Sequence, residues 1–91
     1  MAGLPASAIR VRALRGVAGL SQGELEKRSA GRITREDVSK IEAGQNQATS
    51  FKTRDGLAAG LGIDLRALAE YLDGSLSLET LVRGGASAEA S

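Results

Sequence analysis

A capping box in the first third of the chain fixes where one helix must begin. Ser21 is followed three residues later by Glu24. In such a pair the Ser hydroxyl accepts the backbone N–H of the third helical residue, and the Glu carboxylate reaches back to the N-cap residue. The pair predicts a short helix over about residues 22–29, anchored by Leu25, and any fold of this chain has to accommodate it.

A second start signal lies farther along the chain. Thr34 with Asp37 repeats the same spacing and places an acid in the first turn, where the helix dipole favours negative charge. Another short helix is therefore predicted over about residues 35–43, and Gly44 supplies a left-handed cap that ends it. The intervening segment contains a glycine and makes the turn, so the two helices are joined as in a helix-turn-helix.

Apolar residues at helical spacing predict three more helices, over about residues 7–18, 50–61 and 65–73. Their apolar positions are Ile9, Val11, Leu14 and Val17 in the first, Phe51, Leu57, Ala58 and Leu61 in the second, and Leu65, Leu68, Ala69 and Leu72 in the third. A last helical turn is expected at about residues 78–82.

Two details of the 50–61 helix stay open. Either Thr49 or Ser50 caps its start. Gly56 and Gly60 lie inside it, and each costs about 1 kcal/mol relative to alanine. These glycines either permit a close contact with another helix or leave this helix frayed.

The fold class that composition predicts is all-α. The chain of 91 residues is 42% hydrophobic but only 2% aromatic, and it holds a single proline, which suits helices better than sheets. We expect an N-terminal arm at residues 1–6, a five-helix domain at 7–73, a C-terminal extension at 74–83 and a disordered tail at 84–91. So short a chain has no deep core of its own, which makes oligomerisation an expectation.

The residue types of the chain argue against an enzyme. Cysteine and histidine are both absent from the sequence, which removes thiolate chemistry, the usual zinc ligands and the commonest general base. The carboxylates are scattered along predicted helix surfaces, and there is no glycine-rich phosphate loop and no nucleophile elbow. We therefore expect no catalytic residue, no metal and no cofactor.

The net charge of +1 hides a division along the chain. Residues 1–54 hold ten Lys and Arg residues against five acids, whereas residues 55–91 hold two against six. The first half is suited to meet a polyanion, and the second half to do something else. The alternative is that both halves simply carry the charged faces of any small helical protein.

Membrane and targeting segments are not evident in the sequence. No stretch approaches the ~20 apolar residues of a membrane span, and the first residues lack the apolar stretch of a signal peptide. The expectation is a cytoplasmic protein without a membrane partner. With 91 residues, we also expect no separate ligand-sensing or protease domain.

Several short motifs in a fixed order carry a resemblance to a known family. They are Val11-Arg12, Leu14-Arg15, Gly19-Leu20-Ser21-Gln22, Glu24-Leu25, the run Val38-Ser39-Lys40-Ile41-Glu42-Ala43-Gly44, Leu57-Ala58, Leu61-Gly62-Ile63 and Leu65. Over about residues 7–73 the chain resembles the Cro and lambda-repressor-like helix-turn-helix family, also called the xenobiotic-response-element (XRE) family. The resemblance implies a transcriptional regulator that binds double-stranded DNA, a repressor of the phage, restriction-controller or antitoxin kind that acts as a homodimer on an inverted repeat.

The resemblance implies that the 35–43 helix enters the major groove, which admits one α-helix. Val38 and Ile41 must face the core, so other residues of this helix and its cap remain to contact bases. These residues are Thr34, Arg35, Glu36, Ser39 and Lys40. An arginine can pair with guanine, a glutamate can accept from cytosine, and a lysine can reach a guanine or a phosphate. The alternative is an exposed charged face stabilised by a pair between Glu36 and Lys40.

A further set of residues is expected to contact phosphates, which fixes register without reading sequence. These residues are Gln22, Arg32, Gln45, Asn46, Gln47 and Lys52. Gln22 starts a helix, where free backbone N–H groups favour an anion. The glutamines and asparagine after Gly44 would equally make a solvated loop. Arg12 stays open between a phosphate contact and an exposed helix face.

The resemblance also implies a structural ion pair between Arg15 and Glu42. In the family, an arginine of the first helix and the glutamate of the Ser-x-Ile-Glu-x-Gly motif tie two helices together, and both residues occur here at matching positions. Removal of one partner would leave an uncompensated, partly buried charge.

Two departures from the family pattern occur between the two capped helices. The interval from Leu25 to Ser39 is fourteen residues, longer than usual by about two, so the turn is extended. Glu26 stands where the family normally has an alanine. Our hypothesis is that the longer turn displaces the 35–43 helix enough to make room for this glutamate or to expose it, and that Ile33 fills the resulting space.

The apolar residues of the acidic half predict a dimer interface, since they exceed what a domain of this size needs for its own core. They are Leu65, Leu68, Leu72, Leu76, Leu78, Leu81 and Val82. The alternative is that these residues are ordinary core and that the extension folds back over the domain. A different class of function also stays open, in which the same fold is a protein-interaction module for a toxin or a polymerase.

Overall fold

The computed structural model describes residues 3–46 and 50–85, and over these ranges every regular element is helical. The elements are α1 (Ala6–Ala18), α2 (Gln22–Arg28), α3 (Arg35–Glu42), α4 (Phe51–Leu61), α5 (Leu65–Leu72), α6 (Leu78–Thr80) and a π-helical turn, η1 (Leu81–Gly85). The all-α fold class is therefore confirmed. Of the expected tail, residues 84 and 85 belong to η1, and residues 86–91 lie outside the described ranges.

Three N-cap residues, at the starts of α2, α3 and α4, make the side-chain hydrogen bonds expected of capping residues. Ser21 and Glu24 exchange both hydrogen bonds of a capping box at the start of α2, at 3.1 and 2.8 Å. The bond that the Ser21 backbone N–H donates lowers the pKa of Glu24 from its ordinary value. Thr34 and Asp37 form the same box at the start of α3. Ser50 is the residue that caps α4, because its hydroxyl accepts a backbone N–H of the first turn at 3.1 Å.

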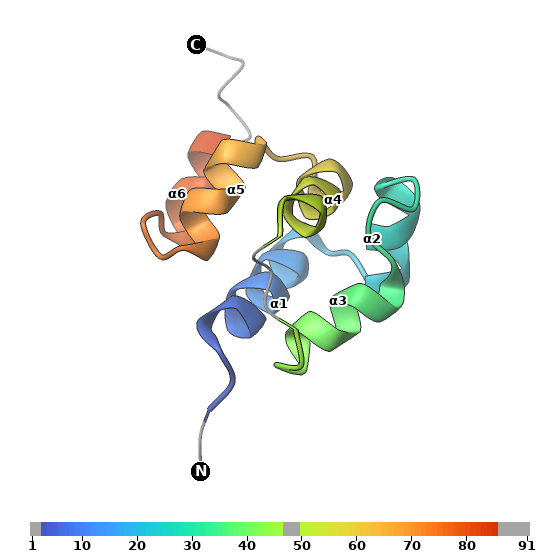
Figure 1. The fold of residues 1–91 in the computed structure, drawn as a ribbon. Coiled ribbons are helices and arrows are strands. Elements are labelled where there is room, and N and C mark those ends of the chain that lie inside the picture. Colours follow the sequence, from blue (N-terminus) through green and yellow to red (C-terminus); the bar gives the residue numbers. More distant parts are fainter. Residues whose placement is uncertain (1–2, 47–49, 86–91) are drawn as a thin grey trace.

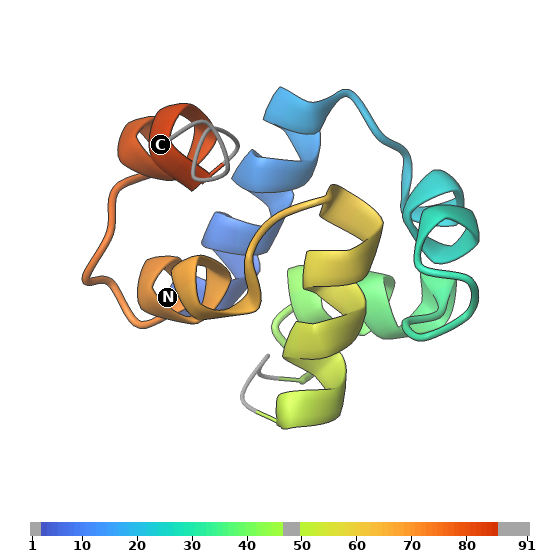
Figure 2. The same cartoon turned by 90° about the horizontal axis from the view of Figure 1, so that it is seen from above.

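The helices are arranged with α1 in the middle of the molecule, while α2 and α6 lie at opposite ends (Figures 1 and 2). The core between them is one cluster of buried residues: Val11, Leu14, Leu25, Ile33, Val38, Ile41, Leu57, Ala58, Leu68, Tyr71, Leu72 and Leu81. Among the described residues, no helix is both long and apolar enough to cross a lipid bilayer.

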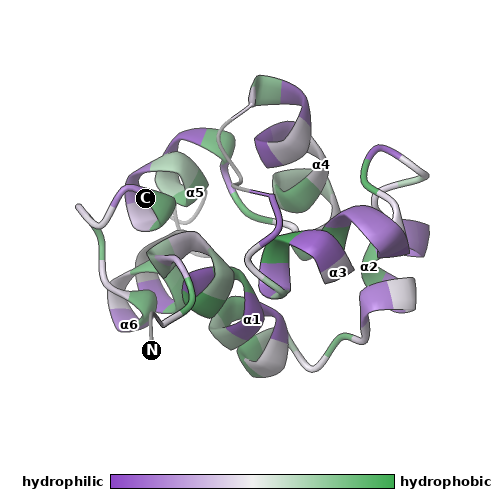
Figure 3. Ribbon diagram, turned by 60° about the horizontal axis from the view of Figure 1, so that its bottom comes forward, coloured by the Kyte–Doolittle hydropathy of each residue, from purple (hydrophilic) through white to green (hydrophobic). Residues whose placement is uncertain are grey.

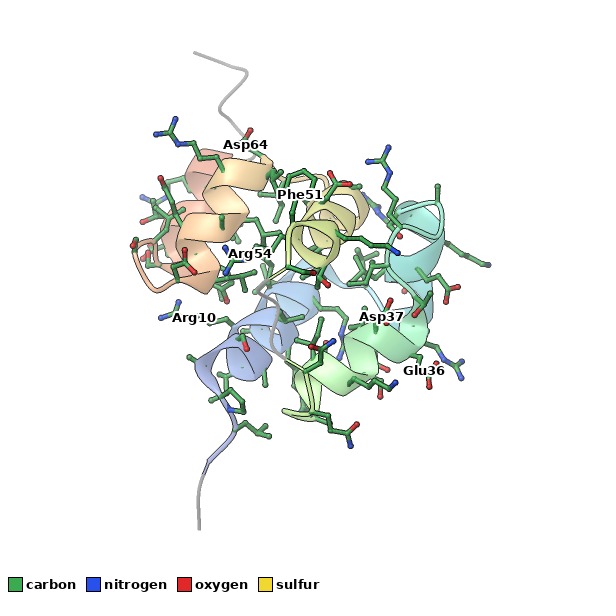
Figure 4. The ribbon with its side chains drawn as sticks, in the orientation of Figure 1. Arg10, Glu36, Asp37, Phe51, Arg54 and Asp64 are labelled. Atoms are coloured by element: carbon green, nitrogen blue, oxygen red, sulfur yellow. The ribbon has the colours of Figure 1, made fainter. Side chains whose placement is uncertain are left out.

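Three predicted apolar positions lie at the surface instead of in the core. Ile9, Val17 and Phe51 are 57%, 56% and 71% exposed. The first two belong to a helix whose buried side is formed by Ala8, Val11 and Leu14, so their helical angle turns them away from the other helices. Figure 4 places Phe51 on α4, where it is the first residue of the helix.

The C-terminal extension folds back onto the domain, and this corrects the predicted dimer interface. Leu68, Leu72 and Leu81 are buried in the chain's own core at 0%, 7% and 1% exposure. The remaining leucines of the predicted interface, Leu65, Leu76 and Leu78, pack against that core. A small helical domain needs this apolar surface for itself, so only Val82 of the predicted set, at 43%, is substantially exposed.

The two glycines of α4 mark where this helix approaches its neighbours closely. A Cβ built on Gly60 would lie 2.6 Å from Cδ1 and 2.9 Å from the carbonyl oxygen of Leu25 in α2. A Cβ on Gly56 would lie 2.8 Å from Cβ of Ile33 and 3.0 Å from the carbonyl oxygen of Arg32. Of the two possibilities that the sequence left open, close contact is therefore the one found: α4 packs through glycine on both α2 and the turn after it.

We expect Gly60→Ala to lower the free energy of unfolding by about 1–3 kcal/mol, because the added methyl group overlaps Leu25 of α2. Gly16→Ala is the matched control, since a Cβ at this exposed position of α1 meets nothing within 4 Å. The control substitution should raise stability by about 0.5–1 kcal/mol through helix propensity. Urea denaturation of both variants measures the difference, and equal stability of the two would contradict the close α2–α4 contact.

Candidate nucleic-acid interface

The third helix presents one apolar face to the core and one polar face to solvent. Val38 and Ile41 are fully buried at 0% exposure. The residues predicted to contact bases are all exposed: Thr34, Arg35, Glu36, Ser39 and Lys40. Figure 3 shows α3 at the front of the molecule with much of its length coloured hydrophilic. The buried spacing of this short helix thus leaves the five predicted residues together on its outer surface.

A groove between the start of α2 and the outer face of α3 joins several predicted site residues. It is lined by Arg15, Ser21, Gln22, Gly23, Arg35, Glu36 and Ser39. Figure 4 shows Glu36 and Asp37 at the α2 end of α3. The lining holds the guanidinium of Arg35, hydroxyl and amide groups and the carboxylate of Glu36, whereas the guanidinium of Arg15 is engaged by Glu42 and Leu20. Guanidinium, hydroxyl and amide groups are donors that bind phosphate oxygens and the edges of bases.

Arg35 lines both this groove and a second one, as does Gly23. The second groove is lined by Gly23, Glu26, Lys27, Ala30, Gly31 and Arg35, so it follows the turn between α2 and α3. A Cβ built on Gly23 would lie 3.7 Å from Cδ of Arg35. The side chain of Arg35 therefore runs alongside α2 at the position where that helix carries a glycine.

The predicted ion pair between Arg15 and Glu42 is present. Nε and Nη2 of Arg15 donate to the two carboxylate oxygens at 2.7 and 2.8 Å, and Nη1 donates to the carbonyl oxygen of Leu20 at 2.9 Å. The hydrogen bond to the carboxylate raises the pKa of Arg15 above its ordinary value. The side-chain amide of Gln22 donates to the same carboxylate at 3.2 Å. One acid of α3 thus holds α1 and α2 in place.

Four of the predicted phosphate-contacting residues are exposed, and one of the four pairs with an acid of the chain. Gln45 and Asn46 are exposed just beyond the end of α3, and Lys52 is exposed in the first turn of α4. Gln47 lies outside the described residues. Arg32 pairs instead with Asp55 of α4 at 3.7 Å, and its side chain is 59% exposed.

Two alternatives from the sequence are visible in the geometry. The exposed pair that would stabilise α3 without DNA exists, since Nζ of Lys40 lies 3.8 Å from a carboxylate oxygen of Glu36. Both side chains are at least half exposed, so this pair is of the weak surface kind and is readily exchanged for another partner. Arg12 is exposed on α1, which fits either of its two interpretations.

The extended turn brings a carboxylate of α2 to the first residue of α3. Oε1 of Glu26 accepts the backbone N–H of Arg35 at 2.9 Å. Ile33 is buried at 1% exposure, so this residue does fill the space beneath the turn. The turn itself contains two successive residues with positive φ, Ala30 at 56° and Gly31 at 82°. Glu26 and the turn that ends at Thr34 are thus connected through the start of α3.

Three residues of this site have contacts that the sequence does not predict. Gly23 lies beside the side chain of Arg35, and no local pattern in the sequence marks this position. Glu26 accepts a hydrogen bond from the start of α3, and this contact depends on a turn conformation that no local pattern specifies. Ser29 is a third such case: its buried hydroxyl accepts the N–H of Ile33 at 3.2 Å.

The comparisons with known proteins add no family to this description. No protein-family model, curated protein or solved structure matches the chain. Among the described residues, no group of acidic side chains is placed so that it could hold a metal ion.

We expect Glu42→Gln to destabilise the fold by about 2–3 kcal/mol, because it leaves the partly buried Arg15 without its charged partner. The double variant Arg15→Met/Glu42→Met should be more stable than Glu42→Gln, since no uncompensated charge remains. Glu36→Gln is the control for an exposed pair and should change stability by less than about 0.5 kcal/mol. Thermal unfolding measures all three, and an effect of Glu42→Gln as small as that of Glu36→Gln would contradict a structural role.

Proposed function

We propose that this chain is a sequence-specific DNA-binding regulator of the Cro and lambda-repressor-like kind, a repressor that acts in the cytoplasm with α3 in the major groove. The observation that carries the proposal is the exposed row on α3, from Thr34 to Lys40, beside a groove shared with the start of α2. Two buried positions fix the inner face of α3, so the outer face is presented as one surface. The motif order of the sequence supports the same proposal.

Within this proposal the residues have separate roles. Arg35 reads a guanine through its planar pair of donors, and Glu36 accepts from a cytosine amino group. Gln45, Asn46 and Lys52 contact phosphates on one side of α3, and the start of α2 contacts a phosphate on the other. The Gln22 amide donates one N–H to Glu42, and the capping box occupies the backbone N–H groups of Ser21 and Glu24. The phosphate contact therefore falls to the second N–H of the Gln22 amide and to the backbone N–H groups of residues 22 and 23.

We also propose a homodimer. Its interface is the outer face of α1 and not the leucines of α5, which are part of the predicted interface. Ile9 and Val17 are exposed there, and shallow apolar depressions beside them reach Leu78 and Val82 of the extension. The surface is self-complementary in charge, because α1 carries three arginines and no acid, whereas residues 64–83 carry four acids and two arginines. A two-fold arrangement can therefore cross a basic helix over an acidic segment.

The same exposed face supports the alternative function, a protein-interaction module. A partner protein with an apolar helix would find the surface that a second copy of the chain would otherwise cover. This alternative does not need the polar outer face of α3. Salt separates the two functions, because DNA binding through several phosphates weakens steeply with salt.

We expect selection from random duplex DNA to recover an inverted repeat, and Arg35→Ala to weaken binding to it by about 1–3 kcal/mol while relaxing the preference at one base position of each half-site. Arg66→Ala is the matched control: it removes the same charge from α5, where the side chain is 89% exposed. An equal loss of affinity on selected and random DNA for Arg35→Ala would show that this residue does not read bases.

We expect the wild-type chain to form a dimer and Val17→Asp to be monomeric, because the substitution places a charge in the apolar face of α1. Phe51→Asp is the control, since it removes an exposed apolar residue from α4 instead. Sedimentation equilibrium measures the oligomeric state of each variant. A wild-type monomer, or a dimer that survives Val17→Asp, would refute this interface.

A further inference from the structure

The start of α3 is held by three hydrogen bonds to side chains, and only one of them comes from another helix. Thr34 and Asp37 accept each other's backbone N–H groups within the capping box. This box moves with α3, so it fixes the shape of the first turn and not its position in the molecule. The third bond runs from the N–H of Arg35 to Oε1 of Glu26 in α2, at 2.9 Å.

Glu26 therefore acts on the position of one particular residue. The N–H that it accepts belongs to Arg35, and this N–H is one of the groups at a helix start that have no partner within the helix. The aliphatic part of the same arginine runs past Gly23, three residues earlier in α2. One turn of α2 thus holds the backbone of Arg35 through Glu26 and guides its side chain past a glycine.

The turn between the helices is built so that this bond can form. Ala30 and Gly31 adopt left-handed backbone conformations, which a non-glycine residue adopts at some cost. The Ser29 hydroxyl accepts the N–H of Ile33 at 3.2 Å and donates to the carbonyl oxygen of Glu26 at 2.9 Å. Because Ile33 is fully buried beneath, the residue that follows the turn is anchored in the core and the start of α3 comes within reach of α2.

We propose that Glu26 is a positioning residue for recognition: by holding the Arg35 N–H it fixes where the guanidinium of Arg35 meets the DNA, and so sets the base preference. This inference rests on the proposed DNA-binding function. Glu26 itself contacts no base in this account. Its carboxylate would weaken binding to every DNA sequence by charge repulsion, so a role in non-specific affinity is not what the residue contributes.

The test compares three variants of the full-length chain. Glu26→Ala removes the acceptor and the charge, whereas Glu26→Gln keeps an acceptor oxygen and removes only the charge. Glu24→Ala is the matched control, because it removes a glutamate of the same helix that caps α2 and does not touch α3. All three variants lose one negative charge from α2, so the change in net charge is the same in each.

We expect Glu26→Ala to reduce the ratio of affinities for selected and random DNA by about tenfold, the loss of one hydrogen bond to a charged group. Glu26→Gln should reduce this ratio by less than about threefold, and Glu24→Ala should leave it unchanged. A variant that only lowers the stability of the fold reduces the affinities for selected and random DNA by the same factor, so it does not change this ratio. A ratio for Glu26→Ala equal to that of Glu24→Ala would overturn the inference.

Amide hydrogen exchange at Arg35 separates this inference from the proposed function. The Arg35 N–H should exchange slowly in the wild-type chain, faster by at least about tenfold in Glu26→Ala, and at an intermediate rate in Glu26→Gln. If the wild-type chain prefers no DNA sequence, the proposed function fails; faster exchange in the variants would still support the attachment of α3 to α2. Unchanged exchange in the Glu26 variants would refute that attachment. If Glu26→Ala did not fold, unchanged exchange in Glu26→Gln alone would refute it.

Discussion

The pair between Arg15 and Glu42 is the interaction on which the arrangement of the first three helices depends. Both ends of the pair are shared: the arginine also donates to the chain just before α2, and the glutamate also accepts from Gln22 at the start of α2. Two side chains therefore fix three helices at the place where they converge. Because the Glu42 carboxylate is nearly buried, loss of its partner would lower the free energy of unfolding strongly. The pair therefore holds α1, α2 and α3 in one arrangement beside the proposed recognition surface.

Close packing through small residues completes what the ion pair begins. Two glycines of α4 carry no side chain, so this helix can approach α2 and the turn after it. Gly60 meets Leu25 there, and Gly56 meets Ile33. Arg28 adds a hydrogen bond from its Nε to the carbonyl oxygen of Gly60 at 2.9 Å. The long turn is consequently not a loose loop. It is covered by α4 on one side and anchored by a buried isoleucine, which is why α3 has one defined position.

The sequence predicts most of the fold because its helix boundaries rest on local chemistry. A hydroxyl three residues before an acid, as in Ser21 and Thr34, forms its bonds within one turn and needs no distant partner. Burial is less predictable, because it depends on which helix lies opposite: Ile9 and Val17 have the right spacing but face solvent, and Leu81 is core instead of interface. The bond from Arg35 to Glu26 could not be predicted for the same reason, since residues nine apart meet only through the exact shape of the turn.

The two proposed surfaces are connected by one rigid element. Arg15 ties α1 to α3, while Val17, two residues later and so roughly opposite on the helix, belongs to the apolar face. A helix of thirteen residues is about 20 Å long and does not bend readily without a proline or an inserted side chain. If a second copy binds along the outer face of α1, the distance between the two recognition helices is set by this helix and by its contacts with the second copy. The spacing of half-sites in the DNA is then a property of α1 and its partner contacts, whereas the base preference within each half-site is a property of α2, α3 and the turn between them.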